Sequence, residues 1–440
     1  MKYLCYVLFI VPALWAGETY RVVIAESDLS KPAWKAVADE LVSKHDGEIL
    51  SFGSDPVEVL GDLKKAHPRY TCFVAPYETV TRTFVSKIHQ LTREIDEDPY
   101  TDTIWGVLTG FDAANALAIA STREPLTVRK VGSGTEFAMD MVEEGAWYDE
   151  LVIGKMVMKK PGGDPKVSQV DQDTTRPLVD LLNTYKSDLF ITSGHATERN
   201  WQIGYRYKNG YFISRSGTLI GRDMQGREHL VDSPNPKVYL PIGNCLMSHI
   251  KGADSMALAW MNSAGVRQMV GYTVETWFGY GGWGLLDYFL EQPGRYTMAE
   301  ANHVNHLALL HKLATQPSRG LRYDRDVVVL YGDPAWEARM ADRPKAWEQS
   351  LDYDDGLWIF NVTPGRAAET FEVINNNGAQ RGGRPIVHLF PHRLIDIEIV
   401  DDNGLNPTIT DDFILVPLPG EYSSEKEYKV TFTARSVMNL

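Results

Sequence analysis

Two apolar stretches that run into short polar motifs decide the fold: LFITSGHAT at residues 189–197 and VYLPIGNCLMSH at residues 238–249. Short apolar runs bounded by glycine or proline are typical of buried strands in a parallel sheet. If these strands are neighbours, His195 and Cys245 emerge side by side at the carboxyl edge of one sheet, where open α/β sheets place their functional sites. A thiol and an imidazole held together indicate nucleophilic catalysis.

Most of the chain before residue 340 alternates strand-like and helix-like segments. The strand-like runs lie at residues 20–25, 70–75, 103–109, 268–272 and 327–330. Amphipathic stretches between them predict helices, and this alternation predicts a mostly parallel sheet flanked by helices. Between the two motifs, Asn209-Gly210 predicts the turn of a hairpin. The polar segment from Lys159 to Gly163 is rich in glycine and proline, so we expect an exposed loop there.

The C-terminal region differs in composition from the rest. A polar and acidic stretch at residues 341–356 predicts a linker. Beyond Leu357, roughly seven short strands separated by turns predict a small Ig-like β-sandwich. The predicted organisation is a signal peptide at 1–16, an N-terminal α/β subdomain at 17–100, a catalytic α/β subdomain at 101–345 and the sandwich at 357–440.

The N-terminal residues predict export. Lys2 precedes an apolar stretch at residues 3–14, and the small residues Ala13 and Ala16 suit signal cleavage. The stretch is too short to span a bilayer, so we expect a secreted, periplasmic or cell-surface protein without a membrane span in its mature chain. A net charge of −14 and a pI of about 5.3 disfavour nucleic acid and anionic membranes as partners.

Cysteine usage separates a core residue from a candidate nucleophile. The chain has three cysteines, and signal cleavage would leave Cys72 and Cys245, which is too few for a disulfide scaffold. Cys72 lies inside an apolar run and is predicted to fill the core. Cys245 follows Gly-Asn at a strand end, where its side chain can reach the surface.

The chemistry of a cysteine nucleophile assigns a role to each neighbouring group. A free thiol with a pKa near 8.5 is mostly protonated at neutral pH, so His195 would take the proton of Cys245 and later pass it to the leaving amine. The backbone N–H groups of Ala196 and Cys245 would form the oxyanion hole, where losing one donor costs roughly 3 kcal/mol in other enzymes. Gly194 and Gly243 would let a substrate approach the backbone closely.

Two simpler interpretations of these residues stay open. His195 could be a capping histidine and Cys245 a buried thiol, with no chemistry between them. His249 lies close to Cys245 in the sequence and competes with His195 as the base.

The two motifs resemble the gingipain-type branch of the caspase-like cysteine peptidases, of clan CD. That family also places a histidine roughly fifty residues ahead of its cysteine. The strand-like residues 103–110 resemble the strand that opens its catalytic sheet, and Gly332-Asp-Pro334 resembles the end of its catalytic domain. The trailing β-sandwich extends the resemblance over most of the chain.

This resemblance implies a caspase/gingipain-like α/β fold and endopeptidase activity on protein or peptide substrates, through a dyad of Cys245 and His195. Where the family has glycine after the histidine, this chain has Ala196, whose N–H remains a usable donor if φ is negative there. The dyad requires no cofactor, although the resemblance implies that structural calcium is possible. The rival function is a catalytically silent homologue that acts as a surface binding protein.

The resemblance also indicates where substrate would bind. Trp277 and Trp283, in a glycine-rich stretch, resemble the wall of the family's S1 pocket, and the alternative is aromatic core. Glu275 or Asp102 could pair with a basic P1 side chain in that pocket.

Three histidines lie on one predicted helix: His303, His306 and His311. His303 and His306 share a face at this spacing. A zinc site would need a third ligand that the sequence does not identify, so no metal site is predicted and packed or solvated histidines are expected.

Overall fold

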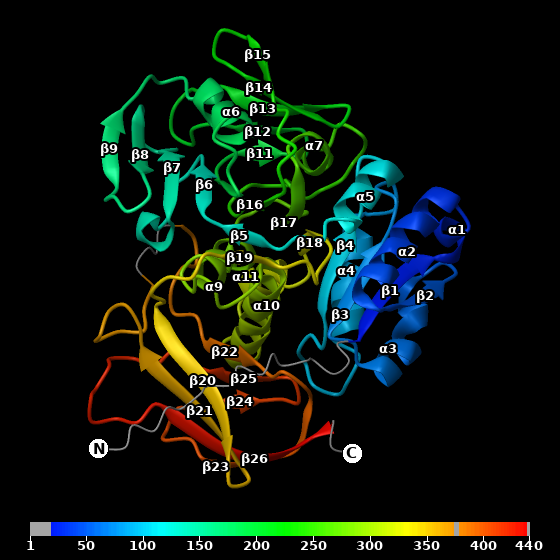
Figure 1. Ribbon diagram of the computed structural model, residues 1–440, viewed down its shortest axis with the longest axis vertical. Coiled ribbons are helices and arrows are strands. Elements are labelled where there is room, and N and C mark those ends of the chain that lie inside the picture. Colours follow the sequence, from blue (N-terminus) through cyan, green and yellow to red (C-terminus); the bar gives the residue numbers. More distant parts are fainter. Residues whose placement is uncertain (1–18, 374–377, 438–440) are drawn as a thin grey trace, which may run out of the picture.

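The computed structural model describes residues 19–373 and 378–437. Its centre is a twelve-stranded sheet in which every pairing is parallel except β17–β18 and the β7–β8–β9 edge (Figure 1). From edge to edge, its strands are β2 (Glu48–Phe52), β1 (Tyr20–Ala25), β3 (Tyr70–Val74), β4 (Ile104–Leu108), β18 (Val328–Gly332), β17 (Val266–Tyr272), β16 (Lys237–Pro241), β10 (Leu189–Thr192), β6 (Lys130–Ser133), β7 (Glu144–Tyr148), β8 (Lys155–Lys159) and β9 (Lys166–Gln169).

Helices flank this sheet (Figure 1). The α-helices are α1 (Glu26–Leu29), α2 (Pro32–His45), α3 (Leu60–Ala66), α4 (Arg82–Thr92), α5 (Ala113–Ala120), α6 (Thr175–Asn183), α7 (Met256–Ser263), α8 (Tyr280–Trp283), α9 (Leu285–Phe289), α10 (Met298–Thr315) and α11 (Arg319–Asp324), and the 3₁₀ helices are η1 (Pro56–Val59) and η2 (Met139–Met141). The predicted class, a mostly parallel α/β sheet flanked by helices and followed by a small β-sandwich, is confirmed.

The two strands that carry the candidate site are fully buried. All residues of β10 and β16 are buried, and Phe190 and Tyr239 have 0% exposure. Because the sheet is covered on both faces, these strands are apolar except for Thr192 and Lys237 at their ends, without the alternation of a half-exposed strand. That pattern is the reason the sequence identified them.

The join between β4 and β18 is narrow. β4 pairs with β3 along its whole length, whereas a single pair, Val107 with Tyr331, links it to β18. β4 is therefore joined more extensively to the strands before it, although the sequence predicts it to open the catalytic subdomain. The division at residue 100 stays a prediction.

A separate five-stranded antiparallel sheet follows the histidine motif. Its strands are β11 (Ala196–Thr197), β12 (Asn200–Gln202), β13 (Tyr211–Arg215), β14 (Thr218–Arg222) and β15 (Glu228–Leu230). Asn209-Gly210 ends the loop of the β12–β13 hairpin, in which Gln202 pairs with Tyr211. A two-residue turn there is wrong, because the tight turn lies at Ser216-Gly217 between β13 and β14, where both φ angles are positive. Asn209 is instead buried, and its side chain donates to the Thr174 hydroxyl. Lys159, predicted in an exposed loop, is buried at the end of β8 with its ammonium on two backbone carbonyls.

The C-terminal region forms two antiparallel sheets, as predicted for a sandwich. One has the order β20 (Trp347–Asp354), β21 (Leu357–Pro364), β26 (Lys429–Ser436) and β23 (Leu394–Asp401), and the other has β22 (Ile386–Leu389), β25 (Phe413–Val416) and β24 (Thr408–Ile409). The predicted linker is wrong in part, because β20 lies within it and pairs with β21 along its length. Its acidic residues face solvent, which made the strand look like a linker. A further two-stranded sheet pairs β5 (Leu126–Val128) with β19 (Ala338–Met340).

Helices α9 and α10 lie between the central sheet and the C-terminal sheets (Figure 1). Tyr288 of α9 donates its hydroxyl to the Pro385 carbonyl beside β22. Nearby, two carboxylates with 0% exposed side chains, Asp287 and Glu291, face three arginines of the C-terminal region: Arg366, Arg381 and Arg384. The C-terminal region is thus tied to the α/β part by buried ion pairs.

None of the helices in the described residues has both the length and the apolarity that crossing a membrane requires. The predicted signal peptide at residues 1–16 lies outside the described residues.

Candidate active site

The structure brings the two predicted catalytic motifs to one edge of the sheet. β10 and β16 are parallel neighbours in the register Leu189↔Val238 to Thr192↔Pro241, so the chain leaves both strands in the same direction. His195 follows the end of β10 and Cys245 follows the end of β16. This is the arrangement that the sequence predicts from two neighbouring buried strands.

The side chain of Asn244 joins the two motifs through hydrogen bonds. Its buried side chain accepts a hydrogen bond from the Thr192 hydroxyl and donates to the Gly194 carbonyl at 3.0 Å. The residue before the candidate nucleophile therefore fixes the backbone before the candidate base. The sequence marks Asn244 only as the neighbour of Cys245 and does not indicate this role.

His195 is exposed on a short loop whose backbone requires glycine at the position before the histidine. Gly194 has φ of 89°, a conformation that side chains with a Cβ rarely adopt. The His195 ring stacks on Tyr205 with the ring centroids 4.7 Å apart. The stacking holds the imidazole at the sheet edge, while its exposure leaves it accessible to a substrate.

Cys245 is half-buried, and its sulfur faces a backbone donor. The Thr276 N–H donates to Sγ at 3.2 Å, and the Thr276 hydroxyl donates to the Asn244 carbonyl at 3.0 Å. An N–H aimed at sulfur stabilises negative charge there, which is the charge that a thiolate carries. Leu246, the next residue, has φ of 59° and donates its N–H to the Val274 carbonyl. The turn around the thiol is therefore held tightly.

Both predicted oxyanion-hole donors are available. The Gln202 N–H donates to the His195 carbonyl, which makes Ala196 a non-hydrogen-bonded position of the β11–β12 ladder, with its N–H directed away from β12. Ala196 is not among the residues with positive φ. An alanine at this position can therefore keep its N–H as a usable donor, as the predicted oxyanion hole requires. Within the described residues, the Cys245 N–H donates to no acceptor.

In the described part of the chain, no hydrogen bond joins Sγ of Cys245 to the ring of His195 or of His249. Catalytic hydrogen bonds are often long without substrate and shorten when it binds. The pKa of His249 is lowered from its ordinary value, and burial of the ring is the main cause.

Glu150 is a candidate site residue that the sequence did not identify. It follows β7, another strand that runs parallel to β10 through β6, and so reaches the same edge. A Cβ placed on Gly194 would lie 3.1 Å from its Oε2, which has no hydrogen-bond partner among the described residues. Burial raises the pKa of Glu150 to about 7, against a hydrogen bond from the Thr135 hydroxyl. An acidic residue two positions after a strand was the available signal, but the irregular pattern around β7 obscured it.

For the peptide hydrolysis that the sequence predicts, we expect Glu150→Gln to lower kcat/KM by about 10- to 100-fold, because Glu150 borders Gly194 and a small displacement of the following His195 would cost that much. Glu150 gains its charge as pH rises through about 7, so its effect on the Gly194 backbone changes over that range. The acid limb of the pH–rate profile should therefore differ between wild type and the variant, which has no carboxyl group there to titrate. The exposed Glu124→Gln serves as the matched control. An unchanged acid limb would show that Glu150 has no part in positioning His195.

The predicted S1 residues divide into two groups. Glu275 and Trp277 are exposed and flank Thr276, so they lie beside the thiol. Trp283 is buried, and a Cβ on Gly243 would lie 2.9 Å from its indole. Trp283 therefore packs against Gly243, two residues before Cys245, and supports the loop that carries the thiol. Asp102, the alternative acid, lies elsewhere in a group of carboxylates, and burial raises its pKa to about 9.

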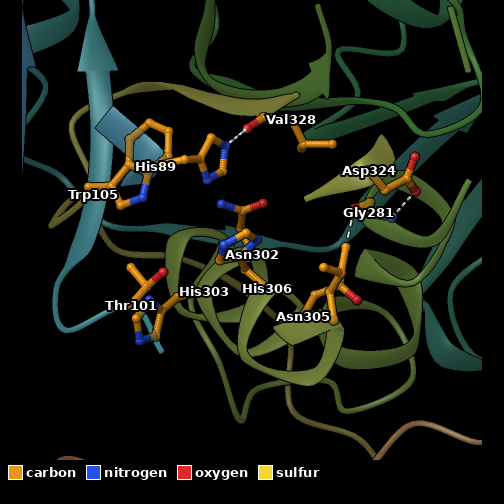
Figure 2. Close-up of a pocket in the computed structure, with 11 residues that line it drawn as sticks. His89, Thr101, Trp105, Gly281, Asn302, His303, Asn305, His306, Asp324 and Val328 are labelled. Carbon is orange, nitrogen blue, oxygen red and sulfur yellow. Dashed lines mark hydrogen bonds between the residues drawn. The ribbon is translucent and has the colours of Figure 1, made fainter. Parts of the chain in front are cut away.

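The helical histidines lie in a different pocket, which Figure 2 shows. His303 and His306 are joined there by His89 of α4, whose ring is 4.8 Å from that of His306 and whose Nε2 donates to the Val328 carbonyl at 2.7 Å. His311 instead contacts Tyr100. The cavity has a volume of about 20 Å³, room for a single water molecule.

These buried histidines predict acid sensitivity. Burial lowers the pKa of His89 to about 4 and that of His303 to about 3. The unfolded chain binds these protons below about 6.5, so the stabilisation present above that pH is lost as pH falls toward 4. Urea unfolding should give the wild type a lower free energy of unfolding at pH 5 than at pH 7. The difference between the two pH values should be smaller for His303→Gln. An equal loss in both proteins would contradict the assignment.

One group of carboxylates lies close enough together to be considered as a cation site. Within the described residues, the carboxylates of Asp96, Asp98 and Asp411 form the one group of three or more ligand-type side chains whose donor atoms all lie within 4.8 Å of each other. Oxygen ligands suit calcium, but Arg393 already pairs with Asp96 and Asp411. The group therefore fits calcium poorly, and structural calcium stays an implication of the resemblance.

The sequence matches no protein-family model and no curated protein. Among solved structures, the chain is similar to the crystal structure of the Arg-specific cysteine proteinase gingipain R, with a TM-score of 0.47 and 9% sequence identity over 92% of each chain. A likeness at this level does not transfer residue roles from one protein to the other.

Proposed function

We propose that the protein is a cysteine endopeptidase with Cys245 as the nucleophile and His195 as the base. One observation carries this proposal. Two neighbouring parallel strands end at the same sheet edge, and the half-buried Cys245 thiol follows one of them while the exposed His195 imidazole follows the other. The Thr276 N–H on the sulfur and the two free backbone donors add the electrostatic features that acyl transfer needs.

In this mechanism, His195 takes the proton from the Cys245 thiol, and the thiolate attacks the carbonyl carbon of the scissile bond. The oxyanion accepts hydrogen bonds from the N–H groups of Ala196 and Cys245. When the intermediate collapses, the C–N bond breaks and the amine leaves with the proton held by His195. Water then hydrolyses the thioester, which releases the carboxylic acid product and restores the thiol.

Export belongs to the same proposal. A peptidase with a leader at residues 1–16 would act outside the cytoplasm on protein or peptide substrates. N-terminal sequencing of the mature protein after expression in a secreting host tests this, and an N-terminus at residue 1 would contradict it.

Covalent labelling tests the peptidase proposal. A peptidyl chloromethyl ketone, which combines peptide recognition with an electrophile, is expected to alkylate Cys245 and to spare Cys72. Burial raises the pKa of the Cys72 thiol and makes it an internal control. The labelling rate should fall in His195→Ala. Peptide mapping by mass spectrometry reads out both sites, and equal labelling of wild type and His195→Ala would favour the catalytically silent binding protein.

A further inference from the structure

A second hollow in the surface adjoins the candidate base. It has a volume of about 380 Å³, within the range of ligand pockets. We call it the tyrosine cavity, because Tyr205, Tyr207 and Tyr211 line it together with Arg206 and Lys208. Neither the sequence motifs nor the mechanism above uses these side chains.

The tyrosine cavity is continuous with the catalytic machinery. Tyr205 lines the cavity and stacks on the His195 ring at 4.7 Å. Gln202 also lines it, and its N–H donates to the His195 carbonyl at 2.9 Å. A peptide held at Cys245 and extending past His195 would therefore enter this cavity.

The loop that forms the cavity is anchored before any ligand arrives. The N–H groups of Tyr205 and Arg206 both donate to the Glu150 carbonyl, and the Tyr207 hydroxyl donates to the Asp149 carbonyl. Asn209, buried at the end of the loop, bonds to Thr174. A fixed loop loses little conformational freedom on binding, as a recognition site requires.

The charges of the cavity define its ligand. Arg206 and Lys208 are exposed, and neither makes an ion pair with any described residue, although the chain has 58 acidic and 44 basic residues. Of the two acidic residues whose backbone carbonyls hold this loop, Asp149 pairs with Lys155 at 2.9 Å, and one carboxylate oxygen of Glu150 accepts from Thr135. Two unpaired cations beside exposed tyrosine rings suit a carboxylate that is hydrogen-bonded and flanked by aromatic surface.

We propose that the tyrosine cavity is a substrate subsite that accepts an acidic side chain of the peptide, through Arg206 and Lys208. This inference rests on the proposed function for its place in catalysis, but the binding that it describes requires no turnover. It gives the peptidase a preference for substrates with aspartate or glutamate at one fixed distance from the scissile bond.

A positional-scanning peptide library tests the proposal, with each position offered as aspartate or asparagine. Wild type is expected to favour aspartate at one position by about tenfold in kcat/KM, the scale of a charged hydrogen bond. The double variant Arg206→Gln/Lys208→Gln should remove this preference. Lys166→Gln, an exposed cation on β9, should keep it. Hydrolysis without an aspartate preference at any position, or with one that survives in the double variant, would overturn the subsite.

Binding separates this proposal from the peptidase proposal. Fluorescein-labelled decapeptide pools, one containing aspartate and the other asparagine, are titrated into Cys245→Ala at low and high salt. The aspartate pool should bind about tenfold more tightly at low salt, and less so at high salt, because surface charges are screened. If no peptide is hydrolysed by wild type yet this difference is present and lost in the double variant, the peptidase proposal fails and the subsite stands. Equal binding of the two pools overturns the subsite, whatever the activity.

Discussion

Cys245→Ala is expected to lower kcat for peptide hydrolysis by about 10⁴-fold or more, the scale at which removal of a nucleophile acts in other hydrolases. Alanine removes the sulfur that forms the acyl-enzyme bond and leaves only the oxyanion hole and substrate binding. His195→Ala should cost nearly as much, because nucleophile and base act as a unit. Neither side chain is part of the apolar core, so both variants should unfold at the wild-type temperature.

Steady-state kinetics on a fluorogenic peptide library, together with thermal unfolding, measures this prediction. Cys72→Ala is the matched control, since it removes the second thiol of the described chain. Cys72 has 0% exposure, so its loss should reduce stability by creating a small cavity and leave kcat per folded molecule unchanged. Turnover retained in Cys245→Ala would refute the peptidase proposal.

The sequence predicted the parts of the site that follow buried parallel strands. Fully buried strands are apolar throughout and are bounded by glycine or proline, so LFIT before His195 and VYLPI before Cys245 could be recognised without a structure. Their neighbouring positions followed from the tendency of such strands to share a sheet. The confirmed fold class has the same origin.

The rest of the site depends on contacts between segments far apart in the chain. Glu150 reaches Gly194 only because β7 lies two strands from β10, and strand order is not encoded locally. His89 joins His306 because α4 meets α10, across more than two hundred residues. The hairpin error at Asn209 has the same cause, because burial against Thr174 overrode the local turn preference.

Arg384→Met is expected to lower the free energy of unfolding by about 3–5 kcal/mol, because several buried acceptors lose their charged donor at about 1–3 kcal/mol each. The Arg384 guanidinium donates to Asp287 at 3.3 Å and to Asn305 at 3.0 Å, and it lies 3.4 Å from the Tyr280 ring centroid. Its side chain is 2% exposed, and that of Asp287 is 0% exposed. Methionine keeps the length of the chain, so the loss reports on charge and hydrogen bonds.

The control for this prediction is the exposed pair Arg435–Asp396, whose side chains are 61% and 60% exposed. Arg435→Met should cost less than about 1 kcal/mol, because exposed ion pairs contribute little. Asp287→Asn in the Arg384→Met background should add to the loss, since Asp287 still pairs with Arg381 there and its removal takes a carboxylate from that buried arginine. The measurement is denaturant unfolding of the wild type, the two single variants and the double variant. If Arg384→Met costs no more than Arg435→Met, the buried ion pairs do not hold the C-terminal sheets against α9, and the apolar and hydroxyl contacts there hold them instead.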